Sequence, residues 1–134
     1  MRLQSVIEHL DDMEPSLDVR IRTIGDAPKE WDGLSPGTEV LSYRGDYSLP
    51  AIEPGCRRDE WDQREEWPAI TVRELANALR ESIGTTINGY KGGDYTVRGH
   101  SPLHVAHWGD WSQCQIVAVV RSGDVCELVV AKTE

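Results

Sequence analysis

The spacing of apolar residues along the chain predicts two helices, and the stronger signal lies in the second half. There, apolar residues recur at i, i+3, i+4, i+7 and i+11, the pattern of one buried helical face. Thr71 and Glu74 stand at the spacing of a capping box, and Gly84 supplies a C-terminal stop. The residues of this face are Val72, Leu75, Ala76, Leu79 and Ile83.

A shorter helix is expected near the N-terminus, from about Val6 to Met13. Ser5 and Glu8 match a second capping box, and Pro15 closes the helix. The apolar residues on its expected inner face are Val6, Ile7, Leu10 and Met13.

Strict alternation of apolar and polar residues predicts a half-buried strand over Leu17–Arg22, with Asp18, Arg20 and Arg22 facing outward. Runs rich in β-branched residues predict further strands, and Ser122-Gly123 predicts the turn of a C-terminal hairpin. These further strands span residues 40–41, 85–88, 95–98, 103–108, 115–121 and 125–130.

Glycine and proline mark the segments between these elements. Residues 25–37 form a loop by composition, and Trp31 within it is expected to cover the edge of the core. Leu49–Ile52 continues as an extended segment, where Pro50 indicates an edge or irregular strand. Residues 109–112 are expected to form another loop.

The order of these elements predicts a single α+β domain spanning residues 1–134. Two helices would pack on one face of a mainly antiparallel β-sheet. Each half contains a helix with a capping box, a strand and a turn rich in tyrosine and glycine, a pattern compatible with an internal pseudo-repeat. The helices are offset by about 66 residues and the turns by about 47, so duplication would require a large insertion in the first half.

Charge and composition narrow the classes of function. The formal net charge of −9 should repel a polynucleotide backbone, because non-specific affinity for nucleic acid comes mostly from cations that neutralise phosphates. No apolar run approaches a membrane span and no signal peptide is evident, so we expect a cytoplasmic protein. Cys56, Cys114 and Cys126 form an odd set without CxxC spacing, which argues against a disulfide framework or a zinc ribbon.

Two short segments share one pattern: tyrosine, a cation, one or two glycines, aspartate, tyrosine and a small hydroxyl residue. They lie at residues 43–48 and 90–96, and together they hold all four tyrosines of the protein. Arg44 and Lys91 occupy equivalent places and would donate charge-assisted hydrogen bonds to a phosphate. The structural alternative is a pair of β-turns whose tyrosines pack on a sheet.

The other residues of these two tyrosine motifs suit a nucleotide-like ligand. Glycine lets backbone N–H groups approach an anion closely, tyrosine rings can stack on a base, and aspartate can accept from ribose hydroxyls. Trp108 could form a further wall of such a pocket. The candidate ligand-binding residues are therefore Tyr43, Arg44, Gly45, Asp46, Tyr47, Tyr90, Lys91, Gly92, Gly93, Asp94, Tyr95 and Trp108.

Two further features have weaker functional interpretations. The most charged stretch, residues 53–68, also carries tryptophans, and it is interpreted as a solvated loop, a lid over a pocket or a partner-binding surface. The histidine-rich stretch lacks any established metal-ligand spacing, so histidines that line the edge of the sheet are preferred to a metal site. The weak metal candidates are His100, His104, His107 and Asp110.

With these motifs in view, the chain resembles a family of small, largely uncharacterised proteins encoded by tailed bacteriophages and prophages. The resemblance covers most of residues 38–120 and is carried by Ser-Tyr-Arg-Gly-x-Tyr at 42–47 and Gly-Tyr-Lys-Gly-Gly at 89–93. Ser101–Ala106, leading to Trp108-Gly109-Asp110, carries the rest. The resemblance implies action inside an infected bacterium, often against host defence. In its residue inventory the chain is similar to phage sponges, which sequester nucleotide immune signals without cleaving them, typically as oligomers.

The leading functional hypothesis is therefore a non-enzymatic, anti-defence binder of a small nucleotide-derived immune signal. It would act in the host bacterial cytoplasm as a homo-oligomer, without a cofactor and without binding polynucleotides or membranes. The first alternative is an acidic inhibitor that binds a host defence protein, imitating nucleic acid through its carboxylates. The second is a metal-dependent hydrolase of a nucleotide signal that uses the histidine cluster.

Overall fold

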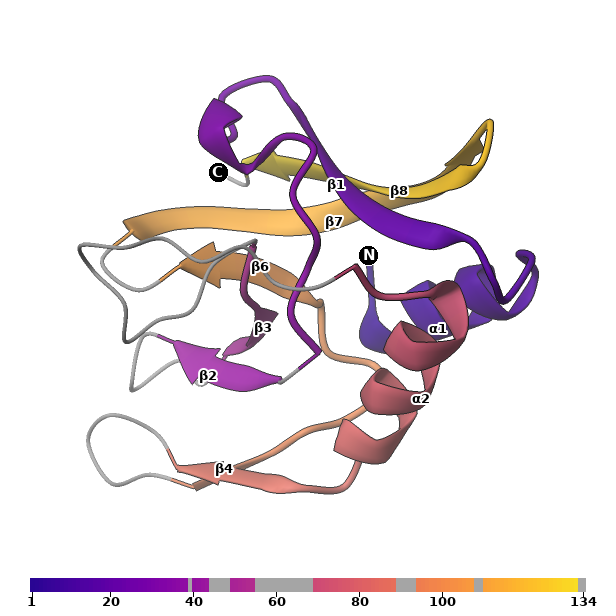
Figure 1. Cartoon of the computed structure of the whole chain (residues 1–134). Helices are drawn as coiled ribbons and strands as arrows, with labels where there is room; N and C mark the ends of the chain where they lie inside the picture. Colours follow the sequence, from indigo (N-terminus) through magenta and orange to yellow (C-terminus); the bar gives the residue numbers. More distant parts are fainter. Residues whose placement is uncertain (39, 44–48, 55–68, 89–93, 108–109, 133–134) are drawn as a thin grey trace.

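The structure is a computed structural model that describes residues 1–38, 40–43, 49–54, 69–88, 94–107 and 110–132 (Figure 1). These residues form an α+β fold, as the sequence predicts, with helices α1 (Leu3–Asp11) and α2 (Val72–Ser82) and the short 3-10 helix η1 (Lys29–Trp31). The strands are β1 (Asp18–Ile24), β2 (Leu41–Tyr43), β3 (Leu49–Ile52), β4 (Thr86–Asn88), β5 (Asp94–Thr96), β6 (His104–His107), β7 (Asp110–Ser122) and β8 (Val125–Lys132).

Six of the described strands form one mixed sheet in the order β1-β8-β7-β6-β3-β2. The pairs β8–β7, β7–β6 and β3–β2 are antiparallel, whereas β1–β8 and β3–β6 are parallel. The sheet is therefore mostly antiparallel, and the expected C-terminal hairpin is present as β7–β8. The two parallel pairs join segments that lie far apart in the sequence.

The hairpin of β4 and β5 forms a separate two-stranded sheet. The strand that follows α1 thus lies at one edge of the large sheet, whereas the strand that follows α2 lies in the small one. The two halves of the chain therefore place the strands after their helices in different sheets, although β2–β3 and β4–β5 are both antiparallel pairs.

Helix α2 forms as the apolar spacing predicts. Its capping box is complete: the Glu74 backbone N–H donates to Thr71 Oγ1 at 3.2 Å, and the Thr71 backbone N–H donates to Glu74 Oε1 at 3.1 Å. Leu75 and Leu79 are fully buried, and burial of such a side chain contributes about 1.5–3 kcal/mol. Gly84 follows the helix with a φ of +89°, a backbone conformation that glycine adopts at low cost.

Helix α1 begins three residues before the expected start, so the prediction of a capping box at Ser5 is wrong. The N-cap is Arg2, and it makes no side-chain capping bond. Instead, the Leu3 and Gln4 backbone N–H groups donate to the carbonyls of Ser101 and Gly99, each at 2.8 Å. A turn distant in sequence therefore satisfies the first helical donors, which must find a partner when they lie inside a fold.

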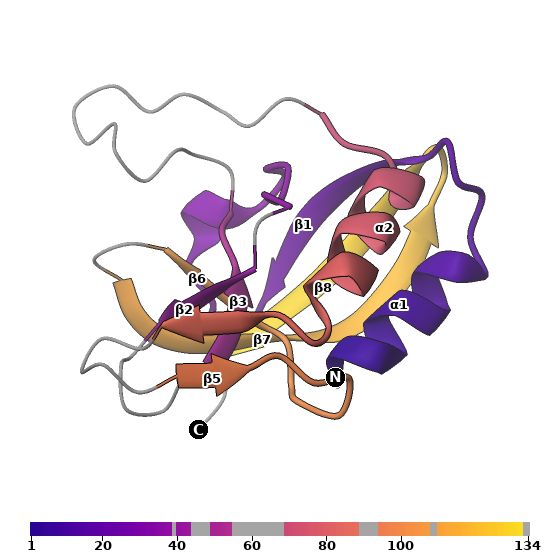
Figure 2. The same ribbon diagram turned by 90° about the horizontal axis from the view of Figure 1, so that it is seen from below.

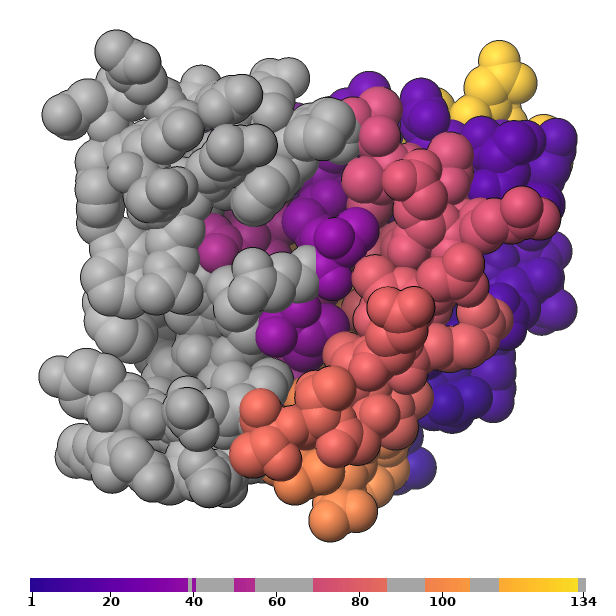
Figure 3. Space-filling model, turned by 60° about the horizontal axis from the view of Figure 1, so that its bottom comes forward, coloured from indigo at the N-terminus to yellow at the C-terminus, as the bar shows by residue number. Residues whose placement is uncertain are grey.

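The two helices lie side by side and contact β7 and β1, covering one face of the large sheet (Figures 1 and 2). The space-filling view shows the surface of α2 continuing into β4 (Figure 3). One cluster of buried apolar side chains joins the helices to the sheet, with members such as Leu10, Leu79, Ile21 and Leu128. Within the described ranges, neither helix has the length and apolar character needed to cross a membrane.

The outer edge of β1 is covered by two segments from elsewhere in the chain. The Ile21 N–H donates to the Leu34 carbonyl at 2.8 Å, and the Gly33 N–H donates to the Ile21 carbonyl at 2.7 Å. Nearer the start of the strand, the Val19 N–H donates to the Ile70 carbonyl at 2.9 Å. Because an uncovered edge is a template for pairing with another chain, these bonds protect β1 from aggregation.

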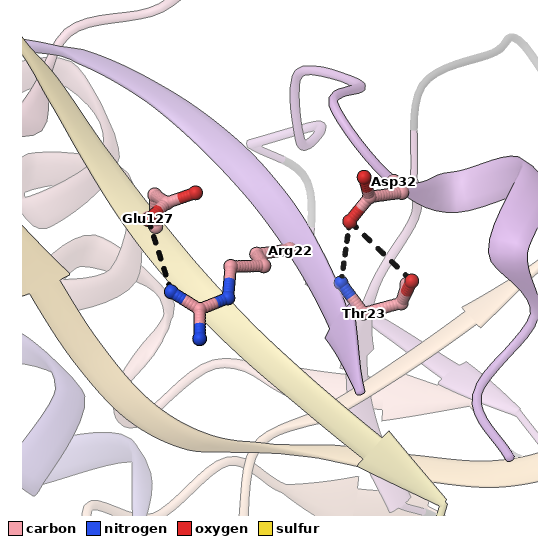
Figure 4. Close-up of polar contacts among 4 residues, drawn as sticks. All are labelled: Arg22, Thr23, Asp32 and Glu127. Carbon is pink, nitrogen blue, oxygen red and sulfur yellow. Dashed lines mark hydrogen bonds and ion pairs between the residues drawn. The ribbon is translucent and has the colours of Figure 1, made fainter. Parts of the chain in front are cut away.

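The loop at residues 25–37 packs as expected, because Trp31 is only 3% exposed and belongs to the core. Asp32 fixes this loop to the end of β1 by accepting from the Thr23 backbone N–H at 2.8 Å and from its hydroxyl at 3.4 Å (Figure 4). One aromatic side chain and one carboxylate thus add to the backbone bonds that hold this loop against β1.

Two strand predictions need correction. Strand β3 is not an edge strand, because it lies between β2 and β6; Pro50 is tolerated because β6 pairs only with Ala51 and Ile52. The loop expected at residues 109–112 is largely strand, since β7 begins at Asp110, which pairs with His107 of β6.

Candidate functional site

Each tyrosine motif lies in the sequence between two antiparallel partner strands, the first between β2 and β3 and the second between β4 and β5. Tyr43 ends β2 and pairs with Leu49 of β3, while Asp94 begins β5 and pairs with Asn88 of β4. Tyr95 follows in β5, where only its backbone position is described. The remaining candidate ligand-binding residues lie outside the described residues: Arg44, Gly45, Asp46, Tyr47, Tyr90, Lys91, Gly92, Gly93 and Trp108.

The hairpins that carry the two motifs are neighbours in space. Strand β2 of the large sheet contacts β4 of the small sheet, although their sequence positions are more than forty residues apart. The sequence shows that the motifs are similar, but it does not show that their strands meet. This contact is the structural observation that relates the two motifs to each other.

The strand leading to Trp108 has the same orientation. Strands β2, β4 and β6 all run toward one side of the molecule, the left side in Figures 1 and 2. Just before and after residues 108–109, His107 of β6 pairs with Asp110 of β7. The described strands that enter the three candidate segments therefore end along one side of the fold, which we call the hairpin edge.

His104 is the candidate histidine whose environment is best described. It lies in β6 between Ala51 of β3 and Gln115 of β7, and its ring is half-buried. Within the described part of the chain, the buried Nδ1 atom has no hydrogen-bond partner of acceptable geometry. Burial lowers the pKa of the ring below 6.5, and the nearby backbone carbonyls of Pro102 and Pro50 oppose that shift only in part.

This environment favours a neutral imidazole over a cation. The N-terminal amino group adds to the lowering of the His104 pKa by charge repulsion. A neutral ring can bind a metal, yet the described residues contain no group of three or more His, Cys, Asp or Glu side chains placed to hold one. His100 is exposed in the turn before β6, and the side chains of His107 and Asp110 lie outside this description.

A buried carboxylate at the end of β3 was missed by the sequence analysis. Glu53 opens the charged stretch interpreted as solvated, but it is only 5% exposed, so that interpretation is wrong for this residue. Its backbone carbonyl accepts from the Gly37 N–H at 2.8 Å. The charged residues that follow Glu53 in the sequence give no local signal of this burial.

The same segment carries a second buried polar group. Ser35 is 3% exposed and accepts from Arg20 Nη1 at 2.7 Å. Residues 33–37 thus connect the edge of β1 to the end of β3 through backbone bonds at both ends. These contacts hold Ser35 and Glu53 in place between β1 and β3. They give no indication of a ligand.

The described cysteines are structural. Cys114 and Cys126 are both buried. Burial, with the charge of Glu127 as a smaller cause, raises the pKa of the Cys126 thiol to about 11, so this thiol stays protonated and unreactive near neutral pH.

Comparison of the chain with protein-family models, with curated proteins and with solved structures finds no match.

Proposed function

We propose that this protein binds a small phosphorylated, nucleotide-derived signal at the hairpin edge and sequesters it without cleaving it. The observation that supports the proposal most directly is the contact between β2 and β4. This contact brings together the strands that lead into Arg44 and Lys91, two cations at equivalent places of a repeated motif. A phosphorylated ligand with more than one anionic group would use both.

The charge of the chain makes such a local pair of cations significant. With a formal net charge of −9, most of the surface repels anions, so affinity for phosphate must come from a few converging donors. A hydrogen bond to a charged group contributes about 1.5–3 kcal/mol, so removing one such cation should weaken binding by roughly 10- to 150-fold.

The resemblance to phage-encoded proteins supplies the biological setting of the proposal. The ligand would be an immune signal of the infected bacterium, and the protein would act in the host cytoplasm. Sequestration requires tight binding and no turnover of the ligand. The nucleotide should therefore be recovered intact from the complex.

Titration calorimetry against cyclic dinucleotides and ADP-ribose-like nucleotides tests this proposal. If the two motifs form one site, the single variants Arg44→Ala and Lys91→Ala each abolish or strongly weaken the only binding event. If each motif binds alone, each variant leaves half of the original stoichiometry. The matched control is Arg73→Ala/Arg121→Ala, which removes two exposed cations away from both motifs.

Absence of heat with every nucleotide tested would refute the proposal, as would wild-type affinity in the Arg44→Ala/Lys91→Ala double variant. Chromatography of the nucleotide after release from the protein tests sequestration separately. A cleaved product would support hydrolysis instead, and the reaction should then depend on added metal and on His104.

A second candidate function is inhibition of a host protein through an acidic surface. The helical layer supports it, because exposed acids outnumber exposed bases on α1 and α2: Glu8, Asp11, Glu74 and Glu81 against Arg73 and Arg80. Capture of one bacterial protein that is lost when these four acids are changed to glutamine or asparagine would favour inhibition. Capture that persists in this variant would count against it.

A further inference from the structure

We propose that the face of the large sheet opposite the helices pairs with a second copy of this chain. This outer face consists of the outward side chains of β1, β8 and β7. They are Arg20, Arg22 and Ile24 on β1, Glu127 and Ala131 on β8, and Ala118 and Val120 on β7. Val129 of β8 lies among them but is only 6% exposed. The inference concerns a different surface from the hairpin edge and is independent of the proposed ligand.

Alternation along the strands defines the outer face. Cys126, Leu128 and Val130 of β8 point into the core, so Glu127 and Val129 between them point to the other side. The register then aligns outward residues of the neighbouring strands in rows. One row is Arg22, Val129 and Ala118, and the next is Ile24 with Ala131.

The outer face gathers the exposed apolar side chains of the described residues. Ile24 and Val117 are each 40% exposed and Val120 is 36% exposed, and they are the large apolar side chains exposed in the described ranges. Val117 stands at the irregularity in β7 between Ile116 and Ala118 and adds to the same region. Exposed apolar side chains gathered on one face of an otherwise charged surface are typical of an interaction site.

The charges on the outer face favour a second copy of this chain as its partner. Arg22 Nη1 of β1 lies 3.4 Å from Glu127 Oε1 of the neighbouring strand β8 (Figure 4). The two side chains remain 49% and 20% exposed. One cation beside one anion is complementary to its own copy turned by a two-fold axis. Each Arg22 would then also approach Glu127 of the partner subunit, as an isologous interface requires.

The rest of the molecule makes this face the favourable one for self-association. The chain carries a formal net charge of −9, so contact between acidic surfaces of two copies costs electrostatic free energy. The outer face instead balances Glu127 with Arg22, and Arg20 adds a further cation nearby. Two copies can therefore meet here without bringing like charges together.

Sedimentation velocity or light scattering over a wide concentration range tests the inference. The wild-type protein should have the mass of two chains. Val120→Glu and Arg22→Glu should each weaken association by more than about tenfold. Arg22→Glu places a carboxylate where Glu127 of the partner subunit approaches, and Val120→Glu places one beside Glu127 of its own chain on the face to be buried. The double variant Arg22→Glu/Glu127→Arg should restore the dimer.

The control is Arg80→Glu, the same charge reversal in the exposed pair of Arg80 and Asp11 on the helical side. It should leave the mass unchanged, and circular dichroism should show that every variant is folded. A wild-type mass of one chain at all concentrations would overturn the inference, as would a dimer equally insensitive to the changes at Arg22 and Arg80. Because the readout is mass, this result is separate from any result on nucleotide binding.

Discussion

Raising the pH should destabilise the protein through one buried thiol. Cys126 has no exposed surface, lies opposite Val19 of β1 and is followed by Glu127. Burial, and secondly the Glu127 charge, raises its pKa from 9.0 to about 11. The folded protein therefore keeps a proton that the unfolded chain loses above pH 9.

The sign and size of the effect follow from these two values. The contribution of Cys126 is fully present below pH 9 and is lost as the pH rises to about 11. A difference of two pKa units corresponds to a loss of about 3 kcal/mol, of which about 1 kcal/mol is already lost at pH 10. This is a large share of the stability of a typical domain, about 5–15 kcal/mol.

Urea unfolding of the wild type and of Cys126→Ala, measured between pH 8 and pH 11.5, isolates this effect. Other groups titrate equally in both proteins, so the difference between their unfolding free energies should shift against the wild type by the stated amount. In Glu127→Gln most of the shift should remain, because burial is the larger cause. A difference between wild type and Cys126→Ala that stays constant with pH would refute the reasoning.

Three further outcomes are expected. Thr71→Ala should cost about 1 kcal/mol of unfolding free energy, whereas Thr71→Ser should retain the cap; equal losses in the two variants would exclude capping as the cause. Leu79→Ala should cost about 2–5 kcal/mol through a core cavity, against less than about 0.5 kcal/mol for the exposed Asn77→Ala, both measured by chemical denaturation. Since burial lowers the pKa of His104, the unfolded ring takes up its proton at higher pH than the folded ring. The wild type should therefore lose stability relative to His104→Gln as the pH falls below 6.5, and parallel pH profiles would contradict this.

The sequence predicts a helix or strand well when the residues that determine it lie within the same short segment. Helix α2 has its cap, its apolar face and its terminating glycine within one short segment, so sequence reasoning located it closely. Helix α1 shows where that reasoning fails, since the carbonyls of Gly99 and Ser101 replace the cap expected at Ser5. The parallel partners of β1 and β3 were not predictable, because alternation identifies a strand but not its neighbour.

The candidate site also has features that the sequence predicts and features that only the structure shows. The composition of the tyrosine motifs is evident in the sequence, whereas the proximity of β2 and β4 is a tertiary property. Burial of Glu53 was missed because charge dominates its sequence neighbourhood, while the path of the backbone after β3 determines its exposure. The grouping of Arg44, Lys91 and the tyrosines in one pocket stays a prediction.

The parallel pairing of β1 with β8 has a consequence for biosynthesis. Strand β1 is synthesised well before β8, the strand that pairs with it in the large sheet. Until β8 is made, the nascent chain exposes apolar side chains and an unpaired edge of β1. Pairing of strands so far apart in sequence is intrinsically slow, so this aggregation-prone state persists. A chaperone that shields β1 during translation would therefore raise the yield of native protein more than one that acts after release.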